Sequence, residues 1–248
     1  MGDLQDKIDL LIKSSNANPV IIEKIKAEKT VAPFSTESRL LAYLQSLNAI
    51  SYADYEDLYQ AYVQENREAN KYLSLFNMTP RTFGQTWAEK HVLSLFPEFI
   101  PATKENLATI FPDFDGEFDL WLEGIRIEVK ACRANNTKTD SSLTERAYYH
   151  RDAKRERFKY HYQQLKPSCC DVFIWIGVCR DELIYWVLTS EELKQTGKLG
   201  SQHRNENTGL SGIEVFEGQV FMTEEELEPF AVKEADILNA VKEKGSIH

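Results

Sequence analysis

The chain has 248 residues, of which 42% are hydrophobic and 27% are charged, and its net charge at pH 7 is −10. This length suits one larger domain or two small ones, and the net charge argues against nucleic-acid contact over the whole surface. The longest apolar run, residues 172–179, is too short for a transmembrane helix, and the four cysteines lack metal-ligand spacing. We therefore expect a cytoplasmic protein with reduced thiols, no zinc site and no membrane contact.

The first 78 residues predict a helical subdomain without a chemical signature. Amphipathic spacing indicates helices around residues 4–12 and 40–47, and a stripe of tyrosines indicates a long helix over residues 52–75. We expect this subdomain to support a second domain over residues 79–248, or to extend a DNA contact or a dimer interface.

A further helix is predicted over residues 82–95. Apolar residues recur there at helical spacing, Thr79-Pro80 precedes them as a start signal, and Pro97 follows as a stop signal. The next Pro- and Gly-containing stretch, residues 111–116, predicts a loop.

Residues 117–130 predict a β-hairpin, because apolar residues alternate with polar ones on both sides of Glu123-Gly124. The glycine supplies the backbone freedom that a tight turn needs. Since strand side chains alternate between two faces, Asp119, Glu128 and Lys130 project together away from the apolar face.

Two carboxylates and an ammonium on neighbouring strands suit metal-assisted phosphodiester cleavage. Mg²⁺ is typically held by one or two carboxylates, waters and phosphate oxygens, and Asp119, Glu128 and the Val129 carbonyl could provide the protein ligands. Lys130 would stabilise negative charge on the attacking hydroxide or the transition state. The simpler interpretation is a solvated strand face, because Glu-x-Lys is frequent by chance.

Phe118-Asp119 followed by Glu128-Val129-Lys130 resembles the PD-(D/E)xK nuclease superfamily, which includes type II restriction endonucleases, junction resolvases and DNA repair nucleases. The resemblance covers residues 80–190 by order of elements, although the literal motif is three side chains. It implies an α/β, restriction-endonuclease-like core with a mixed β-sheet flanked by helices. It also implies dependence on Mg²⁺, or on Mn²⁺ in its place, and products with a 5′ phosphate.

The family pattern extends to positions outside the hairpin. Phe118 stands where the family has proline, and a literal Pro112-Asp113 lies in the predicted loop, so we prefer Asp119 and keep Asp113 as the alternative. Members often carry another acid on the preceding helix. By resemblance this is Glu89, which would orient a metal-bound water or help to hold a second ion. The alternative for Glu89 is a solvated surface residue beside Lys90.

Positive charge is concentrated next to the proposed active strand. Residues 126–166 contain eleven Lys and Arg and five Asp and Glu, a local charge of +6 against −16 for the rest. We expect residues 133–142 to form a loop that enters a DNA groove and residues 144–165 to form a basic helix. The alternative is a helix with ordinary ion pairs and tyrosines packed on a sheet. The expected DNA contacts here are Arg133, Asn135, Asn136, Lys138, Arg151, Lys154, Arg155, Arg157 and Lys159.

The remaining elements complete the order that such a nuclease core needs. Residues 170–180 predict a strand buried on both faces, residues 183–188 predict a second strand, and Thr189 begins a capped helix. His203 and Arg204, in a polar loop, are further expected DNA contacts. The acidic tail predicts one or two helices for packing or for a dimer surface.

These features predict a Mg²⁺-dependent endonuclease that cuts double-stranded DNA at a specific sequence. A homodimer is expected because a two-fold protein matches a palindromic duplex. One alternative is a junction resolvase or repair nuclease with the same three side chains. The other is a non-catalytic DNA-binding protein of the same fold.

Overall fold

The computed structural model describes residues 2–27, 36–114, 116–202 and 218–246. The chain divides into two compact units, Met1–Asn70 and Lys71–His248, so the boundary lies earlier than the predicted one after residue 78. The reason is packing: Leu75 and Phe76 are part of the core of the second unit. The Tyr72 N–H also donates to the Arg180 carbonyl at 2.8 Å, which ties this segment to the larger unit.

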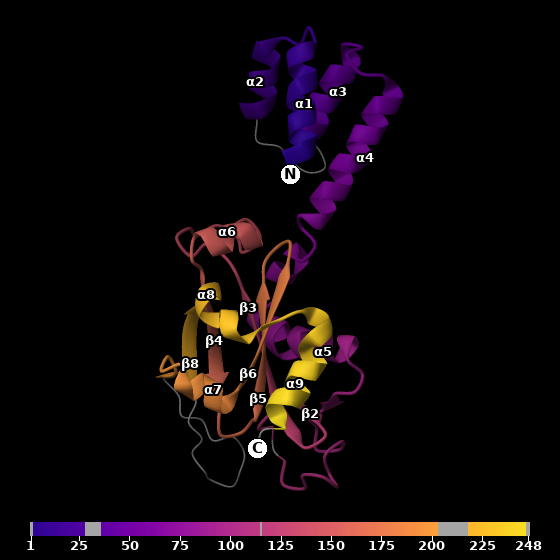
Figure 1. Ribbon diagram of the computed structural model, residues 1–248. Helices are drawn as coiled ribbons and strands as arrows, with labels where there is room; N and C mark the ends of the chain where they lie inside the picture. Colours follow the sequence, from indigo (N-terminus) through magenta and orange to yellow (C-terminus); the bar gives the residue numbers. More distant parts are fainter. Residues whose placement is uncertain (1, 28–35, 115, 203–217, 247–248) are drawn as a thin grey trace. The chain divides into compact units, whose positions relative to one another are not determined.

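The described part of the first unit is helical, as predicted (Figure 1). Its helices are α1 (Gly2–Ser14), α2 (Pro19–Ala27), α3 (Thr36–Ser46) and α4 (Tyr52–Glu68). The helix α2 was not predicted, although Asn18 accepts a hydrogen bond from the Val20 N–H at 2.9 Å in the manner of an N-cap. Ser51 and Asp54 form a capping box at the start of α4, which ends at Glu68 and not at residue 75.

The second unit is built around a mixed six-stranded sheet, which confirms the predicted α/β class. In spatial order its strands are β1 (Ile100–Pro101), β2 (Leu120–Leu122), β3 (Ile125–Arg133), β5 (Val172–Val178), β6 (Leu183–Thr189) and β9 (Ala231–Val232). The pair β3–β5 is parallel and the others are antiparallel. All residues of β5 are buried, as predicted for a central strand covered on both faces.

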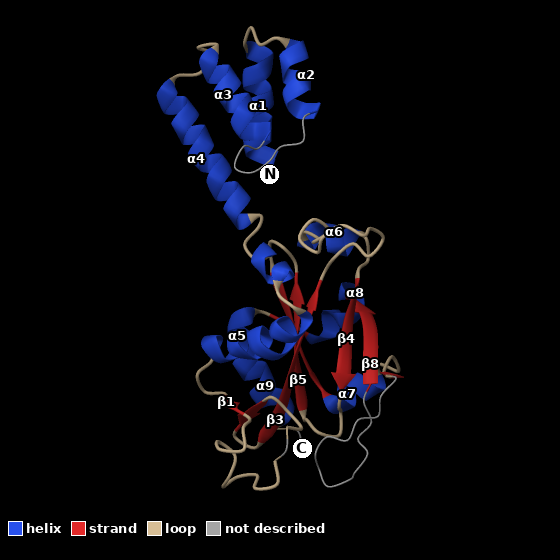
Figure 2. Cartoon of the chain, turned by 180° about the vertical axis from the view of Figure 1, so that it is seen from behind, coloured by secondary structure: helices blue, strands red, loops and turns tan. Residues whose placement is uncertain are grey.

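Helices cover one face of this sheet (Figures 1 and 2). They are the π-helical segment η2 (Thr82–Trp87), α5 (Ala88–Leu95) and α9 (Ile237–Gly245). Their buried residues, such as Ala88, Val92 and Val241, share one core cluster with Ile127 and Val129 of β3. The helix predicted over residues 82–95 therefore exists, with a π-helical first part, a feature that often marks a functional site.

A second, smaller sheet covers the other face. Its strands are β4 (Lys159–Leu165), β8 (Gly218–Thr223) and β7 (Gly200–Ser201), in the order β4-β8-β7. Tyr160 and Tyr162 of β4 point into the core between the sheets, where they pack with Trp175 and Trp186. The two layers thus have aromatic side chains between them.

The basic helix predicted over residues 144–165 is therefore wrong. Within it only α6 (His150–Arg155) is helical, and residues 159–165 form β4. The buried tyrosines alternate at a period of two, which suits a strand, and this period outweighs the helical propensity of the surrounding charged residues. The packing alternative for these tyrosines is the correct one.

Short elements complete the second unit. They are α7 (Ser190–Gln195), α8 (Glu224–Leu227), η1 (Leu73–Asn77), η3 (Glu228–Phe230) and η4 (Glu234–Asp236). The capping box predicted at the start of α7 is present between Thr189 and Glu192. The four cysteines, all in the described part of the chain, are free thiols. None of the described helices combines the length and apolar composition that a bilayer crossing requires.

Gly177 lies where the two sheets pack closely against each other. A Cβ at this position would lie 2.7 Å from both Trp186 Cη2 and Tyr160 Cε1, which are parts of large buried side chains. We expect Gly177→Ala to lower the free energy of unfolding by about 1–3 kcal/mol, because overpacking forces rotamer or backbone shifts. Denaturant unfolding measures this, with Gly200→Ala as the control because its Cβ would meet only a carbonyl oxygen at 3.8 Å. Equal midpoints for Gly177→Ala and the native protein would contradict this packing.

Candidate active site

The predicted hairpin is present and positions the acidic residues. Leu120 pairs with Ile127 and Leu122 with Ile125, while Glu123 and Gly124 have φ values of 49° and 101°. Two successive residues with positive φ are typical of a type I′ turn, which matches the twist of the flanking strands. The register of this turn places Asp119 beside Glu128, on the neighbouring strand.

Asp119 immediately precedes β2, at the point where β3 extends beyond its partner strand. Its Oδ2 accepts a hydrogen bond from the Val129 N–H at 2.8 Å, and its own N–H donates to the Ile127 carbonyl at 2.9 Å. The N–H and C=O groups of one strand residue point to the same side, so the Val129 carbonyl points toward this edge of β3 as well. A carboxylate and a carbonyl oxygen therefore meet beside Glu128.

Glu128 and Lys130 lie on the face of β3 that the second sheet covers. Glu128 is buried, with 4% of its surface exposed, and forms an ion pair with Lys130 through Oε1 and Nζ. The alternative of a solvated strand face is thus wrong for Glu128, because β4 packs beside it. Both charges have lost most of their hydration, which costs free energy. We therefore do not attribute this ion pair to fold stability alone.

The predicted catalytic residues converge on one cleft. Asp119, Glu128, Lys130 and Glu89 all line a cavity of about 680 Å³ that η2, α5, β3 and β4 enclose. Glu89 is half-buried on α5 and lines this cavity, so it is not fully exposed. Asp113, the alternative to Asp119, is exposed in a turn and does not line the cleft.

The pKa values of the carboxyl groups reflect this crowding. Burial and then the Asp119 and Glu128 charges raise the pKa of Glu89 from 4.5 to about 7. Burial and then the Asp119 charge raise the pKa of Glu128 to about 7, and burial also raises that of Asp119. For Lys130 burial lowers the pKa, but the Glu128 and Asp119 carboxylates outweigh it, so the net shift is upward. Lys130 is therefore protonated at neutral pH.

Lys166 is a cleft residue that the sequence reasoning did not assign to the site. It follows β4, lines the same cavity, and its charge lowers the pKa values of Asp119 and Glu128. A bulge before Leu165, with Gln164 at a φ of 54°, brings Gln163 and Gln164 to the cleft too. The only sequence signal was membership of the basic stretch, because nothing local reveals a bulge.

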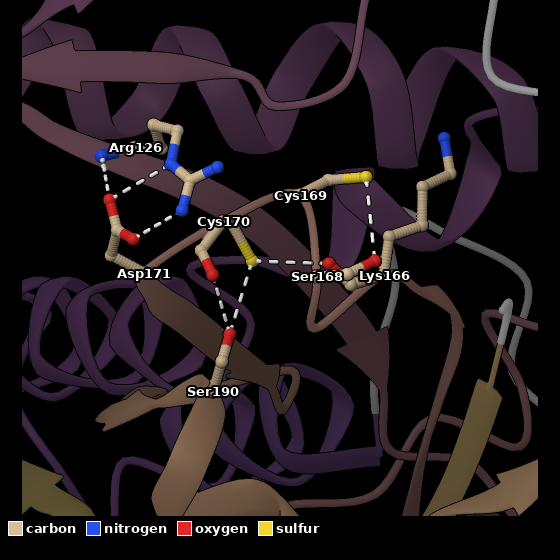
Figure 3. Close-up of polar contacts among 7 residues, drawn as sticks. All are labelled: Arg126, Lys166, Ser168, Cys169, Cys170, Asp171 and Ser190. Carbon is tan, nitrogen blue, oxygen red and sulfur yellow. Dashed lines mark hydrogen bonds and ion pairs between the residues drawn. The ribbon is translucent and has the colours of Figure 1, made fainter. Parts of the chain in front are cut away.

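The segment after Lys166 is held to the base of β3 (Figure 3). Arg126 forms a two-pronged pair with Asp171, through Nε at 3.1 Å and Nη2 at 2.6 Å. The Cys170 thiol lies 3.7 Å from the Lys166 carbonyl, and Ser190 Oγ donates to the Cys170 carbonyl at 2.6 Å. These contacts fix the backbone that carries Lys166, which keeps its charge near the carboxylates.

The donor set of the cleft fits a hard divalent cation. The described residues contain no group of three His, Cys, Asp or Glu side chains arranged as a metal centre, so the side chains do not form a closed site. Mg²⁺ does not require one, because waters and substrate phosphate oxygens usually complete its shell. Asp119, Glu128 and the Val129 carbonyl are oxygen donors, and a cation there would offset both the burial of the carboxylates and the Asp119 charge that together raise the pKa of Glu128.

The predicted DNA contacts divide into several groups. Arg133 lines a second cleft, and its Nη1 also donates to the Leu75, Phe76 and Met78 carbonyls, at 3.2, 3.4 and 2.8 Å. Its guanidinium also lies over the Phe83 ring at 4.5 Å. This half-buried side chain ties η1 to β3, and its contact with DNA stays a prediction.

The loop after β3 is more ordered than predicted. Asn135 forms a β-bridge with Ala147, and the Asn136 N–H donates to the Arg146 carbonyl at 2.8 Å. Asn135, Asn136 and Lys138 line this second cleft together with Lys159. The structure thus brings these four predicted contacts together.

The basic residues on and after α6 pair largely with acids. Lys154 contacts Glu224 at 3.2 Å, Arg157 contacts Glu225 at 2.8 Å, and Arg155 contacts Asp152 at 3.2 Å. Arg151 is more loosely placed, at 3.6 Å from Asp152. These ion pairs reduce the net positive charge of this surface. His203 and Arg204 lie outside the described residues.

The raised carboxyl pKa values predict how stability depends on pH. In the folded state Glu89 and Glu128 have pKa values of about 7 instead of 4.5, so the folded protein binds their protons more tightly than the unfolded chain. Their contribution to stability is full below pH 4.5 and is lost as the pH rises through about 7. We expect metal-free protein to lose stability over this window, by on the order of 1 kcal/mol because Glu89 is partly solvated.

Denaturant unfolding in chelator at several pH values measures this loss. Glu128→Gln and Glu89→Gln should each flatten the profile, while Glu105→Gln, a change in an exposed loop residue, should leave it unchanged. A profile that Glu128→Gln does not alter would show that this carboxyl group does not titrate in the window.

Comparison with known proteins found no family model, no curated protein and no solved structure that matches the chain. The assignment of the cleft therefore depends on its own geometry and charge. Those features are the convergence of Glu89, Asp119, Glu128 and Lys130 and the oxygen donors beside them.

Proposed function

We propose that the chain is a Mg²⁺-dependent endonuclease that hydrolyses phosphodiester bonds in double-stranded DNA, with a restriction-endonuclease-like core. The observation that carries this proposal is the meeting of Asp119, Glu128, Lys130 and Glu89 in one cleft beside β3, an interior strand of a mixed sheet. Each residue type has a distinct task in phosphodiester hydrolysis. A role confined to fold stability does not explain why three carboxylates and a lysine share one cleft.

Asp119, Glu128 and the Val129 carbonyl would hold the Mg²⁺ ion, or Mn²⁺ in its place. The bound ion supplies a water of lowered pKa and a positive charge for the phosphate oxygens. Asp119 is kept in position by its hydrogen bond with the Val129 N–H, so the ligands are preorganised.

Lys130 would stabilise charge on the phosphate, and Glu89 would accept a proton. Lys130 keeps its proton at neutral pH and stabilises negative charge that develops on the phosphate during attack. Glu89 has a pKa of about 7, which suits a group that accepts a proton from the attacking water near neutral pH. Lys166, which lines the same cleft, contributes a further positive charge for the DNA backbone.

The proposed partner is duplex DNA, and the proposed assembly is a homodimer in the cytoplasm. A dimer would present two such clefts to the two strands of a palindromic site. Discrete bands from a digest of linear DNA support sequence specificity, whereas uniform cutting at junctions or damage supports a structure-specific nuclease. A protein that binds DNA but yields no product with Mg²⁺ is the non-catalytic alternative.

Substitutions in the cleft test the catalytic roles. We expect Asp119→Asn, Glu128→Gln and Lys130→Met to reduce DNA cleavage by about a thousandfold or more, because each removes charge at the reacting phosphate. Glu89→Gln should cost about 10–100-fold, as expected for a general base that solvent can partly replace. Plasmid nicking with Mg²⁺ measures the rates, and circular dichroism checks that each variant is folded. Undiminished cutting by Asp119→Asn or Glu128→Gln would overturn the assignment.

Metal binding has a readout that does not depend on activity. A ligand that binds only the folded state stabilises it, by about 2.7 kcal/mol at a concentration of 100 times Kd. We expect MgCl₂ to raise the Tm above that in NaCl of equal ionic strength, and to do so much less for Asp119→Asn and Glu128→Gln. An equal rise in all three proteins would place the ion elsewhere.

A further inference from the structure

A second cleft, of about 630 Å³, adjoins the candidate active site. Pro80, Gly84, Ala131 and His161 line both cavities. The two therefore form one continuous trough along β3, with the carboxylates at one end and Asn135 and its neighbours at the other. A DNA strand with one phosphate beside the carboxylates would therefore extend toward Asn135.

The second cleft contains a rigid aromatic platform. The rings of His161 and Phe221 are stacked, with centroids 3.9 Å apart and planes inclined by 15°. His161 is held by Gln219 at 2.9 Å and by its backbone N–H, which donates to the Cys132 thiol at 3.3 Å. Phe221 is 49% exposed, which is unusual for a phenylalanine and leaves ring surface available to a ligand.

One amide oxygen in the same cleft lacks a hydrogen-bond donor. Asn135 Oδ1 is buried and has no hydrogen-bond partner among the described residues, although Asn135 lines the cleft. Buried acceptors are nearly always satisfied in folded proteins. Lys138 and Lys159, both exposed, lie along the same lining and favour an anionic ligand.

An aromatic platform, an unsatisfied amide oxygen and two lysines together match the parts of a nucleotide. We propose that the second cleft binds an unstacked nucleobase of the substrate strand, near the cleaved phosphate. The base packs on the Phe221–His161 platform, and its exocyclic amino group donates to Asn135 Oδ1. The lysines contact the flanking phosphates. This inference rests on the proposed nuclease function and specifies which bases the enzyme prefers, namely those that carry an amino group.

Single nucleotides in chelator test the base site without catalysis. We expect dAMP and dCMP to perturb the NMR signals of the His161 ring, and dTMP, which lacks an exocyclic amino group, to bind at least several-fold more weakly. Deoxyribose 5-phosphate should not bind, because it has no base to stack.

Two variants assign the contacts. Phe221→Ala should weaken all nucleotides about tenfold, since stacking is lost whatever the base. Asn135→Ala should abolish the preference for dAMP and dCMP over dTMP, and the fold should tolerate it because Oδ1 has no partner to lose. Ile110→Ala is the matched control, because Ile110 is 48% exposed and does not line the trough.

The outcomes separate this inference from the proposed function. DNA cleavage that Phe221→Ala and Asn135→Ala leave unchanged in rate and cut position, with no nucleotide binding, would overturn the base site and leave the nuclease standing. Nucleotide binding with the expected variant effects, but without cleavage by the native protein and Mg²⁺, would overturn the nuclease and leave a nucleotide-binding cleft. Equal binding of deoxyribose 5-phosphate and dAMP would show a phosphate site only, which also overturns the base site.

Discussion

The hydrogen bond from the Val129 N–H to Asp119 Oδ2 organises the candidate active site. The strand β2 is short, and beyond Ile127 the edge of β3 continues without it. At this point the Asp119 side chain accepts the hydrogen bond that a longer β2 would have accepted through its backbone. A carboxylate is thereby fixed at the edge of a central strand, next to Glu128 and the Val129 carbonyl.

Burial gives this arrangement its chemical character. The second sheet covers the face of β3 that carries Glu128, so the carboxylates meet at low solvent exposure and their pKa values rise. Lys130 offsets one negative charge, and the charge of Lys166 also lowers the pKa values of Asp119 and Glu128. Such a site favours either protons or a cation, and which of the two it takes depends on pH and on available metal.

The charge distribution of the molecule is more local than its sequence indicates. The basic stretch is partly neutralised by acids from α8, as in the contacts of Lys154 and Arg157 with Glu224 and Glu225. Lys138 and Lys159 line the second cleft, as do the aromatic residues His161 and Phe221. This combination suits contact with a nucleotide at a defined place better than uniform attraction to a phosphate backbone.

The local elements of the fold were predictable because their signals are local. Alternation and the Glu123-Gly124 turn determined the hairpin, helical spacing determined the helix that carries Glu89, and continuous apolar character determined β5. Two elements were misjudged. Charged residues suggested a helix where Tyr160 and Tyr162 form a strand, and α2 was missed despite its Asn18 cap.

The sequence by itself determined which residues of β2 and β3 share a face, since backbone geometry imposes a period of two on any strand. Tertiary structure alone decided that this face is buried, because the covering strand pairs with β8, which lies far away in sequence. It also decided that Lys166 and the second cleft lie near the carboxylates, and that Arg133 contacts the Met78 carbonyl. Which segments that are distant in sequence lie close together depends on how the layers pack, and a local sequence pattern does not predict this.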